Sequence, residues 1–144
     1  MGSAPSERAR LVERLVLDTS VWIAIERGKL DLDEAVGRNK KLILPAIVAG
    51  ELKQALYTSS RTEAKMQKSL DFFAMVESLT EFAPIDQRVA DRYAEIKHFS
   101  MASGKPRGTA DLLLAATAIE YKASLYSMDK KADFGSLPNL LLHS

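Results

Sequence analysis

The chain has 144 residues, of which 47% are hydrophobic and 27% are charged, and these values are ordinary for one soluble globular domain. Its 20 Lys and Arg residues nearly balance its 19 Asp and Glu residues, which argues against a basic arm that coats nucleic acid but leaves a local basic patch open. The chain has no cysteine, so disulfides, a thiolate nucleophile and cysteine-ligated zinc are excluded.

The chain shows neither a signal peptide nor a membrane span. Its first residues lack the charged-then-apolar order of a signal peptide, and no apolar run approaches the roughly 20 residues that cross a bilayer. We therefore expect no membrane partner and a cytoplasmic location. Residues 1–14 are expected to be a flexible N-terminal extension or a cloning remnant, and residues 15–144 a single domain.

Short apolar runs alternate with helical segments along the chain. The runs predict strands because they are too short for helices and have turn-forming residues nearby; they cover residues 15–17, 42–44, 124–127 and 140–142, with a weaker candidate at 81–83. The first three expected helices cover residues 21–27, after a Ser20 cap, and residues 30–37 and 46–57. The capping-box pattern of residues 60–63 opens a fourth helix, which reaches about residue 79. Asp86 caps the fifth helix, and the sixth covers residues 109–122, with Thr109 as a possible cap. This alternation predicts a parallel sheet covered on both faces, with ligands beyond the carboxyl ends of the strands.

Four acidic residues fall at these strand ends and helix starts. Asp18 follows the first strand, Glu51 falls within the apolar stripe of helix 46–57, and Asp111 opens an almost wholly apolar helix. Asp129 follows the strand that ends at residue 127, and Asp133 comes one turn later. Each also has an ordinary explanation: a turn or cap for Asp18, a buried salt bridge for Glu51, the helix dipole for Asp111 and a solvated turn for Asp129.

If these carboxylates converge, they need a positive partner, and oxygen-only ligands suit Mg²⁺ or Mn²⁺. The two histidines lie outside the acidic segments, His98 on a helix surface and His143 near the end of the chain, so histidine-based catalysis has little support. The pattern points to phosphoryl transfer or phosphodiester hydrolysis by an activated water. Lys105 and Arg107, just before Asp111, either hold substrate phosphates or belong to a solvated loop.

The ordered set of motifs resembles the PIN-domain ribonucleases, and the length and layout resemble the VapC-type toxins of toxin–antitoxin modules. The resemblance rests on Asp18 in Val-Leu-Asp-Thr-Ser, Glu51 in Gly-Glu-Leu, Asp111 before Leu-Ala-Ala-Thr-Ala, and Asp129 in Ser-Met-Asp followed by Asp133. It implies a PIN-like three-layer α/β/α sandwich with a short central parallel sheet. It also implies an Mg²⁺- or Mn²⁺-dependent endoribonuclease that cuts RNA, forms a homodimer and is inhibited by a small cognate antitoxin protein.

The resemblance also implies roles for individual residues of this chain. The resemblance implies Asp18, Glu51, Asp111 and Asp129 as catalytic metal ligands, with Asp133 as an additional ligand or in place of Asp129. Substrate contacts would come from Ser20, Lys105, Arg107 and Ser127, although the family usually has Thr where this chain has Ser127.

Helices 30–37 and 46–57 are expected to frame a groove for the antitoxin. Its apolar anchors would be Trp22, Ile25, Leu30, Leu32, Val36 and Leu56, unless these side chains are ordinary core. Two other functions stay open: an inactive PIN-like scaffold that binds RNA or protein, and a haloacid-dehalogenase-like phosphatase. The phosphatase chemistry needs a second Asp at position 20, where this chain has Ser.

Overall fold

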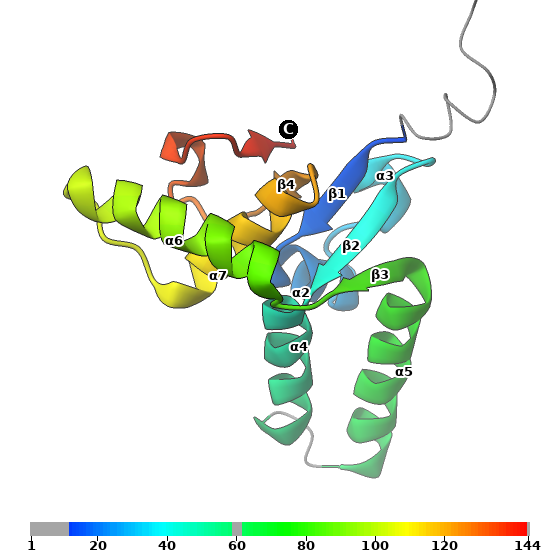
Figure 1. Ribbon diagram of the computed structural model, residues 1–144. Coiled ribbons are helices and arrows are strands. Elements are labelled where there is room, and N and C mark those ends of the chain that lie inside the picture. The colour runs from blue at the N-terminus through cyan, green and yellow to red at the C-terminus, as the bar shows by residue number, and fades with distance from the viewer. Residues whose placement is uncertain (1–11, 59–61, 144) are drawn as a thin grey trace, which may run out of the picture.

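The structure is a computed structural model that describes residues 12–58 and 62–143, and its centre is a five-stranded parallel sheet (Figure 1). The strands are β1 (Arg14–Leu17), β2 (Lys41–Pro45), β3 (Thr80–Ala83), β4 (Ser124–Tyr126) and β5 (Leu141–Leu142). They lie in the order β3-β2-β1-β4-β5, and every pairing is parallel. All five predicted strands are therefore present, including the weaker one at residues 81–83.

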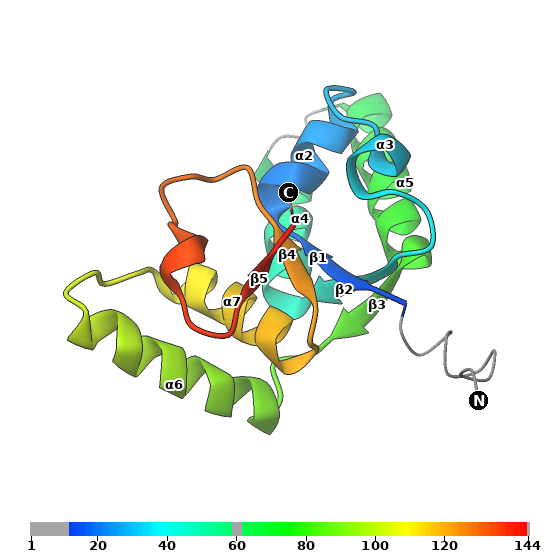
Figure 2. The ribbon, with the colours of Figure 1, turned by 90° about the horizontal axis from the view of Figure 1, so that it is seen from above.

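Six α-helices are described, together with the 3₁₀ helix η1 (Phe134–Ser136). They are α2 (Thr19–Glu26), α3 (Leu32–Val36), α4 (Ala46–Thr58), α5 (Glu63–Leu79), α6 (Gln87–Ala102) and α7 (Thr109–Glu120). Figure 2 shows α6 and α7 on one face of the sheet and α2, α3 and α5 on the other. The architecture is the predicted α/β/α sandwich, and α4 and α5 form a helical hairpin that extends from it (Figure 1).

The sheet is buried because its central strands are apolar on both faces, as parallel sheets covered by helices require. In β1, Leu15, Val16 and Leu17 are at most 1% exposed, and α7 is buried almost all round, as its sequence predicts. No helix within the described ranges is long and apolar enough to cross a membrane. Strand β1 begins at Arg14, one residue before the strand expected at residues 15–17.

Several helix ends differ from the prediction. Asp18, not Ser20, occupies the N-cap position of α2, and Gly108, not Thr109, that of α7. The first residue of the capping-box pattern, Ser60, lies outside the described residues, and the Thr62 hydroxyl caps α5 by accepting from the Lys65 amide at 3.2 Å.

Two other helices show how local chemistry sets the ends. Helix α3 is shorter than predicted because Asp31 caps it and Gly37, with a φ of 76°, ends it. Asp86 caps α6 as predicted, accepting from the Val89 amide at 3.0 Å. On α6, Val89 and Ile96 are buried, whereas Phe99 is exposed.

The expected antitoxin groove is not lined as predicted. Trp22 and Val36 are buried in the protein's own core, at 0% and 4% exposed, so they are not available to a partner. The Trp22 ring packs edge-to-face against Phe72, with 6.5 Å between ring centroids. The other four proposed anchors are partly buried; they are Ile25, Leu30, Leu32 and Leu56. The ordinary-core interpretation therefore holds for Trp22 and Val36.

Candidate active site

The site lies where the strand order reverses, at the carboxyl edge of the sheet. From β1 the chain builds outward through β2 to β3, and it then returns to place β4 on the other side of β1. A crevice opens beyond the strand ends at such a reversal. Asp18 directly follows the central strand β1, Glu51 lies on α4 directly after β2, and Asp129 lies three residues beyond β4. Three of the four predicted acids therefore follow three neighbouring strands.

Hydroxyl groups fix the Asp18 carboxylate. The Ser127 hydroxyl donates to Asp18 Oδ2 at 2.6 Å, and the Ser20 hydroxyl lies 3.4 Å from the same oxygen. The Asp129 amide donates in turn to the Ser127 hydroxyl at 3.0 Å, and the Met128 amide to the Ser20 hydroxyl at 3.3 Å. This network joins the end of β1, the start of α2 and the chain after β4, so both predicted hydroxyl residues orient an acid of the site.

Glu51 is placed differently from the expectation. The helical wheel placed it within the buried stripe of α4, but its side chain is exposed, and Val48 and Leu52 form the buried face. The Thr19 hydroxyl donates to Glu51 Oε1 at 2.7 Å, across 32 residues of sequence. Sequence reasoning missed Thr19; its position directly after Asp18 was the available signal.

Asp111 shows that the four acids share one electrostatic environment. Partial burial raises the pKa of its carboxyl above the usual value, and the charges of Asp129, Asp18 and Glu51 raise the pKa further. The Arg107 guanidinium acts in the opposite direction and lowers the pKa. Asp111 is thus the residue at which the charges of the other three acids raise the pKa.

Asp133 is not brought to this cluster. Its carboxylate lies 3.6 Å from Lys105 Nζ and 3.7 Å from an Arg107 amino nitrogen, and its charge is not among those that raise the pKa of Asp111. The residue has a left-handed backbone, with a φ of 48°, a conformation that Asp adopts more readily than most residues. Asp129, whose Oδ1 accepts from the Lys131 amide at 3.0 Å, is the acid whose charge raises the pKa of Asp111 most.

The two predicted phosphate-binding cations have different environments. The Lys105 side chain is 67% exposed and free to reach a ligand beyond its ion pair with Asp133. The Arg107 side chain is only 6% exposed and is committed to internal hydrogen bonds, so little of its guanidinium faces the solvent. His98 is exposed on α6 as expected, and His143 bonds through Nε2 to the Ala35 carbonyl at 3.0 Å.

The donor set fits a hard divalent cation. Four carboxylates supply oxygen ligands only, which suits Mg²⁺ or Mn²⁺, and their mutual repulsion at Asp111 is what a bound cation would relieve. Within the described ranges, no three His, Cys, Asp or Glu side chains form a ready-made metal site.

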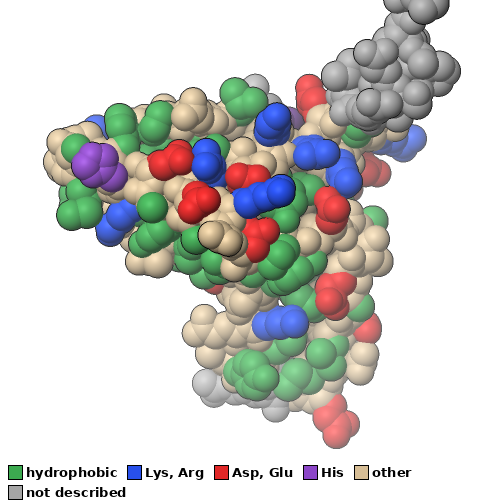
Figure 3. Space-filling model, in the orientation of Figure 1, with side chains coloured by type: hydrophobic (Ala, Val, Ile, Leu, Met, Phe, Trp, Pro, Cys, Tyr) green, Lys and Arg blue, Asp and Glu red, His purple; other side chains and the backbone are tan. Residues whose placement is uncertain are grey.

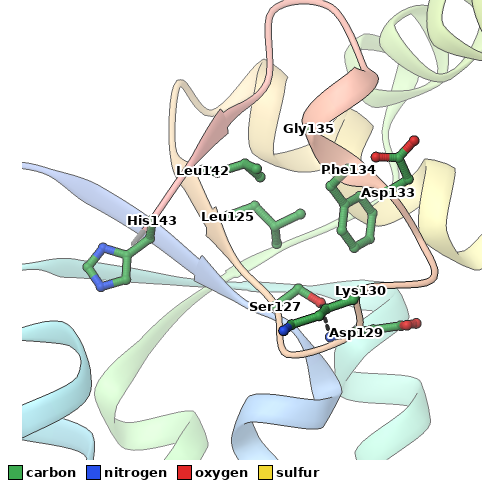
Figure 4. A pocket seen from close by; sticks show the side chains of 9 residues that line it. All are labelled: Leu125, Ser127, Asp129, Lys130, Asp133, Phe134, Gly135, Leu142 and His143. Carbon is green, nitrogen blue, oxygen red and sulfur yellow. Dashed lines mark hydrogen bonds between the residues drawn. The ribbon is translucent and has the colours of Figure 1, made fainter.

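A cavity of about 330 Å³ lies beside the loop that carries Asp129 (Figure 4). Leu125, Phe134 and Leu142 form its apolar side, and the carboxylates of Asp129 and Asp133 point away from it. On the face seen in Figure 3, acidic and basic side chains are intermixed and form no continuous basic area. This distribution agrees with the nearly balanced charge of the chain.

Comparison with known proteins assigns the family. The PIN-domain family model matches residues 15–137. The chain is 34% identical over 126 residues to the Ribonuclease VapC of Rickettsia bellii, covering 88% of this chain and 92% of that protein. It is 30% identical over 124 residues to Ribonuclease VapC5 of Mycobacterium tuberculosis, covering 85% and 86% of the two chains.

Solved structures support the fold. VapBC2 from Rickettsia felis, bound to a promoter DNA fragment, superposes with a TM-score of 0.77 at 22% identity, over 90% of this chain and 97% of that chain. VapBC-1 from nontypeable Haemophilus influenzae gives a TM-score of 0.75 at 18% identity, over 91% and 97%. With the family model spanning nearly the whole described domain and the curated relatives aligned over most of their length, the chain belongs to the PIN-domain family and groups with its VapC members.

Proposed function

We propose that this protein is a divalent-metal-dependent endoribonuclease, the toxin of a type II toxin–antitoxin module, acting in the cytoplasm. The proposal is supported by the positions of Asp18, Glu51 and Asp129 after three neighbouring strands and by the raised pKa of Asp111, to which the charges of all three contribute. Relatives that are 30–34% identical are named ribonucleases, which supports RNA as the substrate. The match to the PIN family removes the haloacid-dehalogenase-like alternative.

In the proposed mechanism, Asp18, Glu51, Asp111 and Asp129 would hold Mg²⁺ or Mn²⁺. Such an ion would supply Lewis acidity that lowers the pKa of a water for attack on an RNA phosphodiester. The chain's own contribution is orientation. Ser127 fixes Asp18 and the backbone of Asp129, and Thr19 fixes Glu51.

The exposed Lys105 ammonium is proposed to contact a substrate phosphate beside the acids. Similar structures of VapBC pairs support a small cognate antitoxin as partner. We propose that the antitoxin covers the acidic edge with a basic side chain, because complementary charge both guides and fixes such contacts. A homodimer is proposed on the family resemblance.

The test is cleavage of RNA by the purified protein in Mg²⁺, in Mn²⁺ and in EDTA. Asp18→Asn removes a proposed ligand, and Asp91→Asn, an exposed carboxylate on α6, is the matched control. We expect cleavage by wild type and the control only with metal, and none by Asp18→Asn. If the wild-type protein binds RNA and does not cleave it, the proposal is wrong and the alternative of an inactive PIN-like scaffold takes its place. Sequencing of RNA 5′ ends from expressing cells then identifies the substrate.

A further inference from the structure

The Arg107 side chain joins two segments that carry acids of the site. Arg107 lies in the connection between α6 and α7, four residues before Asp111. Its Nε donates to the Ala132 carbonyl and one amino nitrogen to the Asp133 carbonyl, both at 3.1 Å. Both carbonyls belong to the β4–η1 loop, residues 127–133, which also carries Asp129.

The other guanidinium contacts complete the attachment. One amino nitrogen donates to the Ser100 hydroxyl at 3.2 Å, and the other to the Ser136 hydroxyl. Ser100 is 1% exposed, and its hydroxyl donates to the Lys105 carbonyl at 2.5 Å, so the α6–α7 connection is itself fixed. Figures 1 and 2 both show the β4–η1 loop beside this connection. A planar guanidinium satisfies such a set of acceptors, and a lysine ammonium does not.

We propose that Arg107 is a positioning residue of the metal site, which holds the β4–η1 loop so that Asp129 stands opposite Asp111. The inference rests on the proposed function, because it assigns Arg107 a role toward the metal that the acids bind. It replaces the expectation that Arg107 contacts RNA. Groups that orient metal ligands typically change metal affinity about 10- to 100-fold when they are removed.

The positive charge of Arg107 and its hydrogen bonds have opposite effects on the binding of a cation by the acids. A positive charge near the acids weakens the attraction of a cation, whereas the hydrogen bonds that hold the loop strengthen binding by fixing the ligands in advance. Lysine keeps the charge and loses the planar set of donors, and glutamine loses both. The two substitutions therefore separate positioning from electrostatics.

The experiment measures Mn²⁺ affinity by electron paramagnetic resonance of the free ion, for wild type, Arg107→Lys and Arg107→Gln. Arg92→Gln is the matched control, because Arg92 is an ion-paired arginine on α6 whose partners are Glu95 and Glu120. Hydrogen exchange of the β4–η1 loop amides is followed in the same proteins. Ser136→Ala, which removes one acceptor, is a milder variant should Arg107→Lys fail to fold.

Positioning predicts that Arg107→Lys weakens Mn²⁺ binding about tenfold and speeds exchange in the loop. Arg107→Gln should bind Mn²⁺ more tightly than Arg107→Lys does, and Arg92→Gln should keep wild-type affinity even where its melting temperature falls. Wild-type affinity and exchange in Arg107→Lys would overturn the inference. If wild type itself binds no Mn²⁺, the proposed function fails, and the exchange rates still decide whether Arg107 holds the loop.

Discussion

Replacing Asp111 with Asn tests whether the acid at the start of α7 is a metal ligand or a helix-dipole residue. Burial and three neighbouring negative charges raise the pKa of this carboxyl in the folded protein. A raised folded-state pKa means that ionisation costs stability once the pH exceeds the unfolded value of about 3.9. Without metal, Asp111→Asn should therefore be at least as stable as wild type at pH 7. The difference should vanish as the pH falls below about 4.

With Mg²⁺ bound, wild type should become more stable than Asp111→Asn. At a free Mg²⁺ concentration of 100 times Kd, binding stabilises wild type by about 2.7 kcal/mol. For a domain of 144 residues, this corresponds to a rise in melting temperature of about 8 °C. If loss of one carboxylate raises Kd about 100-fold, the same Mg²⁺ concentration stabilises the mutant by about 0.4 kcal/mol, or about 1 °C.

The assay is thermal unfolding of both proteins in EDTA and in Mg²⁺, at pH 7 and at a lower pH. The dipole alternative predicts that Asn loses about 0.3–1 kcal/mol with and without metal, and that Mg²⁺ acts equally on both proteins. A mutant that is less stable in EDTA and keeps the whole Mg²⁺ shift would refute the reasoning.

Substitutions at three further positions test two contacts of the acids and one helix cap. Ser127→Ala should weaken Mg²⁺ binding because it frees Asp18, and Ser127→Thr should restore it; calorimetric titration measures both. Thr19→Val should lower the cleavage rate by releasing Glu51 while the melting temperature stays within about 2 °C, and an unchanged rate would contradict this role. Asp86→Ala should lose about 0.5–2 kcal/mol of stability in urea unfolding, with cleavage unchanged, because it only caps α6.

The sequence predicted the fold well because the strands are unusually clear. Runs such as residues 15–17 and 42–44 are apolar, short and bounded by turn formers, and buried parallel strands have this pattern. Alternation with helices then implied a parallel sheet, and the carboxyl-end rule indicated where Asp18 and Asp129 lie. Helix ends were less accurate, since Asp18 and Ser20 are both good caps and only the backbone decides between them.

What the sequence did not reveal depends on tertiary contacts. The sequence leaves Arg107 either in contact with substrate phosphates or in a solvated loop, and only the path of the β4–η1 loop shows that its side chain is buried. Glu51 falls in an apolar stripe on a helical wheel, yet α4 turns that position to the solvent-exposed edge. Trp22 and Val36 looked like docking residues because a sequence pattern does not separate a surface apolar face from a core one.

The position of β1 at the centre of the sheet has a consequence for how the activity arises during synthesis. β1 leaves the ribosome first among the strands, but one of its two neighbours, β4, follows more than 100 residues later. Until that neighbour emerges, Asp18 lacks the Ser127 hydroxyl, and Asp129 does not yet exist beside it. A nascent chain that has not yet reached β4 therefore lacks both Ser127 and Asp129, and its acid cluster is incomplete.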